Sequence, residues 1–355
     1  SAVFGNPATL TTYYGGTNFM FGATFYMPRA QMQHDGSAGY AVGEAANLLN
    51  ITAGGTGRAG GVRAYSFDAR SKADVYAVPT VAVTQDLTGL GIPVVLGVGV
   101  SATSGIGVDY KHHSNTLGAA AELINLGFNA GIGMSVTPNL DVGVSATITY
   151  AMLEAGLTGS GGMTHDIGFR ATLGGRMKVM PGLTVGAYVQ TEQPHEYDNL
   201  HVTSMGGVGA LSNANITAQQ QPAIKCNGTS GNVCRQDVRV EQPMNIGLGF
   251  AFDGLMNGNL LVMADITHKA WSDARFFNEF YEDQEVYSVG LQLTQGPMKF
   301  RLGYGYADDP LKATVADGVQ IKTIGGVNEG GSTYTSAMYP LFMSYFQAME
   351  TPVIY

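Results

Sequence analysis

Apolar and polar side chains alternate strictly over long segments of the chain. From residue 124 to 136 every second side chain is aliphatic or aromatic, and Gly, Asn or Ser stands between them. The same rhythm resumes from 140 to 150, after the three residues Thr137-Pro138-Asn139. Because successive side chains of a strand point to opposite faces, this period of two predicts β-strands. The two segments are expected to form a hairpin.

Similar segments recur through the chain and predict about 12 strands. The clearest apolar stripes lie at 19–27, 124–136, 140–150, 167–173, 183–189, 244–252, 260–266, 287–293 and 300–306. Weaker strands are expected near 75–85, 93–104 and 339–349, with 352–355 as a candidate start of one more.

The predicted connections alternate in length. Short ones lie near 86–92, 137–139, 180–182, 253–258, 295–297 and 350–352. Long ones lie near 33–74, 105–120, 152–164, 193–240, 270–284 and 307–338. Outer-membrane barrels have short turns at one end and long loops at the other. A soluble sandwich has no reason to sort its connections in this way, so the alternation favours a transmembrane antiparallel β-barrel.

Composition strengthens this interpretation. The chain has 50 Gly among 355 residues, and 13% of its residues are charged. Soluble domains carry about twice that charge and about half that Gly. The positions between the apolar stripes hold small polar residues, where a soluble sandwich would carry many Lys and Glu. Since backbone N–H and C=O groups in a bilayer must be bonded within the protein, we expect the stripes to face lipid and the small-residue face to line a lumen.

Other classes of protein fit less well. A membrane-spanning helix needs about 18 apolar residues, and the most apolar stretch, Gly91–Val100, is short and interrupted by Gly and Pro. A net charge of −9 without a basic cluster argues against nucleic acid as a partner. No nucleophile elbow or metalloprotease pattern is present, and the adjacent His112 and His113 beside Asp109 make a poor metal site. The sequence therefore predicts no catalytic residue, no metal and no cofactor.

The chain contains two cysteines, Cys226 and Cys234, close together in a polar stretch. Their spacing suits a small loop closed by a disulfide, which implies an oxidising compartment. Two free thiols in a loop are the alternative.

Five short motifs, taken in order, resemble those of the FadL family, outer-membrane transporters of long-chain fatty acids and aromatic hydrocarbons. Taken singly each is weak, but together they cover most of the chain. They are Asn6-Pro7-Ala8 before the first strand, Lys72-Ala73-Asp74 leading into a strand with Pro79, Ser101–Gly107 in the third strand, and the strand ends Ala270-Trp271-Ser272 and Gly303–Pro310.

The resemblance implies a barrel of about 14 strands closed inside by an N-terminal hatch. Residues 1–15 are expected to be the end of that hatch and 16–355 the barrel. Most of the hatch and the last one or two strands are not found, so either the sequence is a fragment or the barrel closes differently. The hatch motif Asn6, Pro7 and Ala8 is expected to anchor against the inner wall, although an ordinary turn is the alternative. Gly105 and Gly107 match the position of the family's third-strand kink, which opens the wall sideways, although the strand could simply end there.

Large side chains on the inward face are candidates for a ligand pocket: Met20, Tyr26, Tyr188 and Met263. They could equally fill space between the hatch and the wall. Arg170 and Arg176 are also expected to point inward, because each falls on the face opposite the apolar stripe of its strand. Each could pair with the carboxylate of a ligand or with a lumenal Asp or Glu.

The resemblance implies passive uptake of hydrophobic small molecules across the Gram-negative outer membrane. Fatty acids, alkanes and monoaromatic compounds would all suit a lumenal pocket with a lateral exit. The chain is expected to act as a monomer surrounded by lipid and lipopolysaccharide. A porin for small polar solutes is the main alternative, disfavoured by the weakly charged inner face. An outer-membrane enzyme or an adhesin acting through loops 33–74 and 193–240 is the third.

Overall fold

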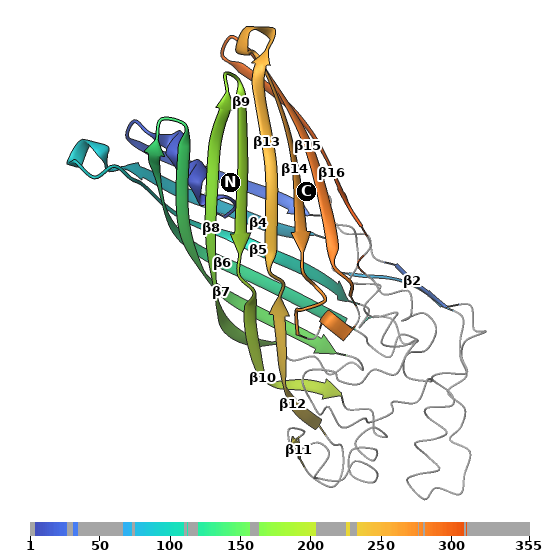
Figure 1. The fold of residues 1–355 in the computed structure, drawn as a ribbon. Helices are drawn as coiled ribbons and strands as arrows, with labels where there is room; N and C mark the ends of the chain where they lie inside the picture. The colour runs from blue at the N-terminus through green and yellow to red at the C-terminus, as the bar shows by residue number, and fades with distance from the viewer. Residues whose placement is uncertain are drawn as a thin grey trace, which may run out of the picture.

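The computed structural model describes residues 4–26, 31–34, 67–72, 75–109, 112, 120–156, 163–203, 225–227, 233–275, 277–279, 281–308 and 310. Its main element is an 11-stranded antiparallel sheet that curls strongly (Figure 1). In spatial order its strands are β1(Thr17–Tyr26), β4(Tyr76–Asp86), β5(Val95–Asp109), β6(Ala120–Thr137), β7(Leu140–Gly156), β8(Thr164–Met180), β9(Leu183–Gln190), β13(Asn245–Leu255), β14(Leu260–Lys269), β15(Gln284–Gln295) and β16(Met298–Ala307). Eleven predicted strands are confirmed, while 339–349 and 352–355 lie outside the described residues.

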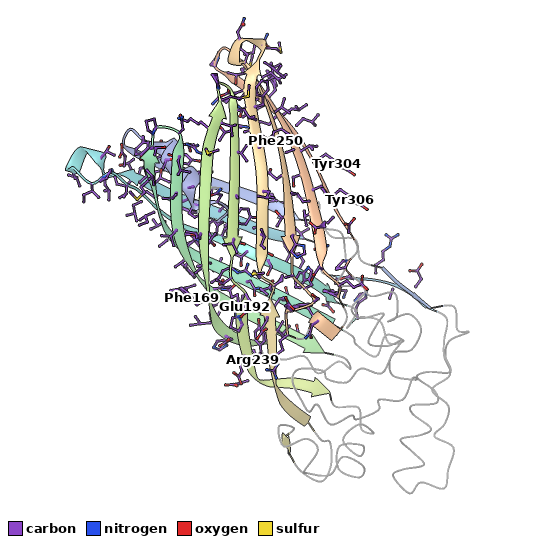
Figure 2. All side chains as sticks on the ribbon, in the orientation of Figure 1. Phe169, Glu192, Arg239, Phe250, Tyr304 and Tyr306 are labelled. Atoms are coloured by element: carbon purple, nitrogen blue, oxygen red, sulfur yellow. The ribbon has the colours of Figure 1, made fainter. Side chains whose placement is uncertain are left out.

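The two faces of this sheet differ as the alternation predicts. Apolar side chains cover the outer face, where Phe21 is 82% and Leu302 73% exposed. Figure 2 shows others, among them Phe250 and Tyr304, projecting from the strands. Small polar side chains are buried on the inner face, with Thr149 at 0% and Asn125 at 1% exposure. Such a distribution is the reverse of that in a soluble protein and fits a barrel immersed in lipid.

The connections are sorted between the two ends of the sheet. The short ones, at 87–94, 138–139, 181–182, 256–259 and 296–297, all lie at one end, which we call the turn end (Figure 1). The turns of 181–182 and 296–297 use Gly182 and Gly296 at φ of 80° and 59°, a conformation that costs glycine little. The predicted alternation of connections is confirmed at these five turns. We call the opposite end the loop end.

Several predicted loops contain strand residues. The prediction of a loop over 105–120 was wrong at its start, because β5 continues to Asp109 and stays paired with β6. The segment 193–240, also predicted as a loop, contains most of a separate sheet of β10(Gln193–Thr203), β12(Val233–Gln242) and β11(Lys225–Asn227). Its strands alternate poorly because they carry many charged and amide side chains. The prediction of a loop over 33–74 was also wrong at its ends, where two short strands, β2(Gln31–His34) and β3(Phe67–Arg70), pair with each other.

The β10 strand lies against the inner side of β7 and β8 near the loop end. Gln193 donates a hydrogen bond from Nε2 to the hydroxyl of Thr149, at 2.9 Å. The His195 ring occupies the space that a side chain at Gly168 would need, and Tyr197 is fully buried. Because β9 pairs directly with β13, residues 191–244 leave the barrel wall and return to it at the neighbouring strand.

A 3-10 helix, η1(Pro7–Tyr13), packs against the inner face of β5 to β8 near the turn end. Leu10 is fully buried in a small apolar cluster with Ala82 and Val95, against which Phe4 and Tyr13 pack. In the part of the chain that the structure describes, no helix has both the length and the apolar character needed to cross a membrane.

Candidate functional site

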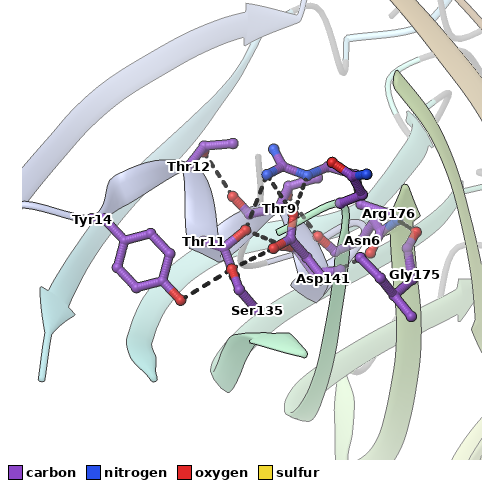
Figure 3. A network of polar contacts seen from close by, with 12 residues as sticks. Asn6, Thr9, Thr11, Thr12, Tyr14, Ser135, Asp141, Gly175 and Arg176 are labelled. Atoms are coloured by element: carbon purple, nitrogen blue, oxygen red, sulfur yellow. Dashed lines mark hydrogen bonds and ion pairs between the residues drawn. The ribbon is translucent and has the colours of Figure 1, made fainter. Parts of the chain in front are cut away.

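Asn6 ties the start of η1 to two strands of the wall. Its Nδ2 donates hydrogen bonds to the carbonyls of Gly175 on β8, at 2.9 Å, and Ala187 on β9, at 3.0 Å. Its Oδ1 accepts a hydrogen bond from the amide of Ala8 at 3.0 Å, which caps the helix (Figure 3). The amide group thus uses both donors on the wall and its acceptor on the helix. We call residues 4–14 the plug segment.

Three inward glycines make room for the plug segment. Gly133, Gly143 and Gly174 lie side by side on β6, β7 and β8, each the register partner of the next. A β-carbon at Gly143 would overlap the Pro7–Ala8 peptide, and one at Gly174 would overlap the Asn6 amide. We call these three residues the glycine row. The sequence shows a glycine-rich inner face, but only the strand register shows that these glycines align under Asn6-Pro7-Ala8.

A polar network holds the other side of η1 (Figure 3). Arg176 forms a salt bridge with Asp141 at 2.6 Å, and its Nη2 also donates to the Thr11 hydroxyl at 3.2 Å. The Ser135 hydroxyl donates to the second oxygen of Asp141 and accepts from the hydroxyl of Tyr14. Of the two roles expected for Arg176, the structure shows pairing with a lumenal Asp.

The wall is interrupted between β4 and β5. These strands pair from Asp86–Val95 up to Thr80–Ser101 and no further within the described residues. Beyond that point residues 76–79 pair with β1, and the remainder of β5 pairs with β6. At the loop end the strands are tied again, where the Lys72 amide donates to the Asp109 carbonyl at 2.8 Å. We call the stretch of 76–79 and 102–108 the β4–β5 break.

Gly105 and Gly107 lie within this break. The alternative that the strand ends there was wrong, since both residues pair with β6. The irregularity of β5 lies at Thr103, where the register shifts between Ala102 and Ser104. A β-carbon at Gly105 would meet open space, whereas Gly107 is covered by Tyr76 of β4.

Arg170 lies on the inner face of β8, closer to the loop end than the plug segment. Its Nη2 donates to the carbonyl of Pro243 at 2.6 Å, and its Nε is buried with no hydrogen-bond partner among the described residues. Lys269 of β14 lies close enough for its charge to interact with that of Arg170. Sequence reasoning missed Lys269, although it falls on the same face of the strand as Met263, because it lies beyond the apolar stripe that ends at Ile266. Arg170 and Lys269 thus bring two cationic side chains to this part of the inner face.

The other pocket candidates lie apart from one another. Tyr188 is close to Arg170 and reaches the Thr267 hydroxyl at 3.3 Å. Met263 lies on the inner face of β14 beside Gly290, and Met20 lies on β1 opposite Ala82. Tyr26 is paired with β4 through its backbone, and its side chain lies outside the described residues. A shallow apolar depression is on the outer, lipid-facing side instead, lined by Leu126, Phe128, Ile148, Tyr150 and Ile167.

The motif Ala270-Trp271-Ser272 begins a compact loop after β14. The Trp271 ring packs edge-on against Phe277 at 4.8 Å between ring centres and against Tyr281 at 5.6 Å. Burial opposes ionisation of Asp283, but hydrogen bonds from Ser272 and the charge of His268 outweigh it, so the pKa of Asp283 lies below its usual value. These contacts give the loop a small core of its own.

Cys226 and Cys234 stand directly opposite each other on β11 and β12. Antiparallel partners have neighbouring β-carbons, so we expect a disulfide. Neither thiol should react with iodoacetamide before reduction, and both should react after it. A Cys234→Ser variant, the control, should expose one reactive thiol without reduction. Alkylation of both cysteines in the native, unreduced protein would contradict the disulfide.

No family model matches the chain, and no curated protein sequence matches it significantly. Solved structures do resemble it. The toluene transporter TodX of Pseudomonas putida is 16% identical, with a TM-score of 0.55 over 87% of this chain and 79% of that one. A FadL homologue of Pseudomonas aeruginosa is 13% identical, with a TM-score of 0.59 over 88% and 76%. The CymD monoaromatic hydrocarbon channel is 16% identical, with a TM-score of 0.52 over 86% and 78%. The fold implied by the resemblance to the FadL family is therefore confirmed.

Proposed function

We propose that this chain is a passive channel of the Gram-negative outer membrane for hydrophobic small molecules. The apolar outer face of the sheet supports a location in lipid. The barrels that share its fold include a toluene transporter and a monoaromatic hydrocarbon channel. The chain works as a monomer among lipid and lipopolysaccharide, with residues 1–15 as the end of its hatch.

The observation that carries this proposal is the relative position of the plug segment and the β4–β5 break. The plug segment rests on Gly133, which pairs with Val95 near the turn end of β5. The break begins beyond Ser101, closer to the loop end. A solute entering from the loop end therefore reaches the break before it reaches the plug. Since an apolar solute gains about 25 cal/mol per Å² of surface kept from water, leaving sideways into lipid is favourable.

The lumen above the plug segment supplies the binding site. Tyr188, which lies close to Arg170 on the inner face, contributes apolar surface, as pockets for such ligands require. Arg170, with its buried Nε and neighbouring Lys269, receives an anionic head group. A carboxylate forms strong charge-assisted hydrogen bonds with a guanidinium. Fatty acids are thus the substrate class that this lumen fits best.

Uptake by whole cells tests the proposal. A Gram-negative host without a fatty-acid channel of its own is given labelled oleate or labelled toluene, with and without this chain. We expect uptake of oleate to rise clearly with the chain present. The purified protein should show no steady ion conductance in planar bilayers. Unchanged uptake together with large, steady conductance would instead make it a porin for polar solutes.

A further inference from the structure

The side chain of Tyr76 spans the β4–β5 break. Tyr76 belongs to β4, yet its hydroxyl lies so close over Gly107 of β5 that a β-carbon there would overlap it. Gly107 is buried for this reason. Glu122 of β6 is the next neighbour of that position. At this point the two strands meet through a phenol ring instead of through paired backbones.

The backbone has features that oppose closing the break by itself. Pro79, in the middle of the stretch, has no N–H to donate to a neighbouring strand. The bulge at Thr103 shifts the register of β5 just where its pairing with β4 ends. Extending the β4–β5 ladder would require a change of register along β5. A side chain is therefore the feature that can cover the gap.

A side-chain cover can move without any loss of backbone hydrogen bonds. Tyrosine turns about two side-chain dihedrals, and rotamer changes of accessible side chains take picoseconds to nanoseconds. Gly107 has no side chain, which leaves room for the ring of Tyr76 over its backbone. Gly105, two residues earlier, also has no side chain, and a β-carbon there would meet open space.

We propose that Tyr76 is the gate of the β4–β5 break and sets the cross-section of the solute that leaves sideways. This inference rests on the lateral route of the proposed function. With the ring turned aside, a linear alkyl chain or a single aromatic ring passes. Branched and bicyclic hydrocarbons pass poorly, because the ring turned aside still borders the opening.

Variants that change only the size of this side chain test the gate. Tyr76→Ala should raise uptake of a bicyclic hydrocarbon such as naphthalene about tenfold relative to a linear alkane, the usual scale of steric discrimination by an apolar site. Tyr76→Phe should keep the native selectivity, because it keeps the ring. Tyr76→Trp should lower uptake of both solutes. Tyr287→Ala, an exposed tyrosine on β15, is the matched control and should change nothing.

Chemical labelling, which does not depend on transport, tests the role of Tyr76 separately from the proposed transport function. Ser104 is the inward partner of Asn125 behind the break. In proteoliposomes of a Ser104→Cys variant, a lipid-dissolved maleimide should label this cysteine faster when Tyr76 is Ala, as read by peptide mass mapping. Equal labelling rates, or equal selectivity of native and Tyr76→Ala proteins, would overturn the gate. Native protein that takes up no hydrophobic solute would overturn the proposed function, while the labelling rates would still decide whether Tyr76 covers the break.

Discussion

Replacing Gly143 by Leu is expected to expel the plug segment and make the barrel leaky. Gly143 is the centre of the glycine row, and any β-carbon there overlaps the Pro7–Ala8 peptide. That peptide has little freedom to retreat, because Asn6 is bonded to two wall strands on one side. Overpacking costs about 1–3 kcal/mol and occasionally more. Such a penalty shifts the balance between bound and released plug by roughly ten- to a hundredfold.

The leak is measured as sensitivity of cells to a large polar antibiotic and as conductance of the purified protein in planar bilayers. Both should increase in Gly143→Leu and increase less in Gly143→Ala. Gly175→Leu is the matched control, since a β-carbon at Gly175 on the neighbouring strand meets open space. Heat-dependent migration on gels verifies that each variant is folded. Folded Gly143→Leu protein with native conductance would show that the plug segment does not close the lumen.

Replacing Arg170 by Met should weaken binding of a fatty acid about a hundredfold while sparing toluene. The change keeps an unbranched apolar stem but removes the guanidinium charge that would meet the carboxylate. Leaving one member of a buried charged pair without its partner costs about 2–5 kcal/mol, and about 3 kcal/mol corresponds to roughly a hundredfold in Kd. Toluene has no charge, so its binding should stay near the native value.

Titration calorimetry in detergent checks this difference between the two ligands. Arg301→Met is the matched control, because Arg301 lies on β16 and bonds to Gln292 at 2.8 Å, away from Arg170. A parallel loss of affinity for oleate in both variants would point to a general charge effect. Unchanged oleate binding by Arg170→Met would place the head group elsewhere in the lumen.

The sequence predicts the wall of this protein far better than its interior. Lipid on one side imposes a period of two on every wall strand, so β6 and β7 could be read from their alternation alone. No such constraint acts on β10 and β12, whose faces meet protein and water, and they were predicted as a loop. The strand ends at Asp109 and Gly156 also extend beyond their apolar stripes, because β5 and β7 both stay paired with β6 as far as Ala120.

The site was predicted in part for a related reason. The motif Asn6-Pro7-Ala8 marks the plug segment, but its partners Gly175 and Ala187 are some 170 to 180 positions away. Contacts over such distances depend on strand register, which one sequence does not reveal. The alternation along β8 predicted that Arg170 and Arg176 both point inward. It could not predict which of the two is neutralised by Asp141. The gap beside Gly107 depends on the end of pairing between two other strands, so it too needed the structure.

The direct pairing of β9 with β13 has a consequence for how this protein can change. Gln190 and Asn245 are adjacent register partners, so everything between them is an insertion whose two ends already touch. Gln193, His195 and Tyr197 pack inside the wall and must be kept, but the part of the insertion beyond them can be lengthened, shortened or exchanged with little effect on the strands that carry it. A natural or engineered variant could thus carry a new surface domain between β9 and β13 while its barrel wall stays the same.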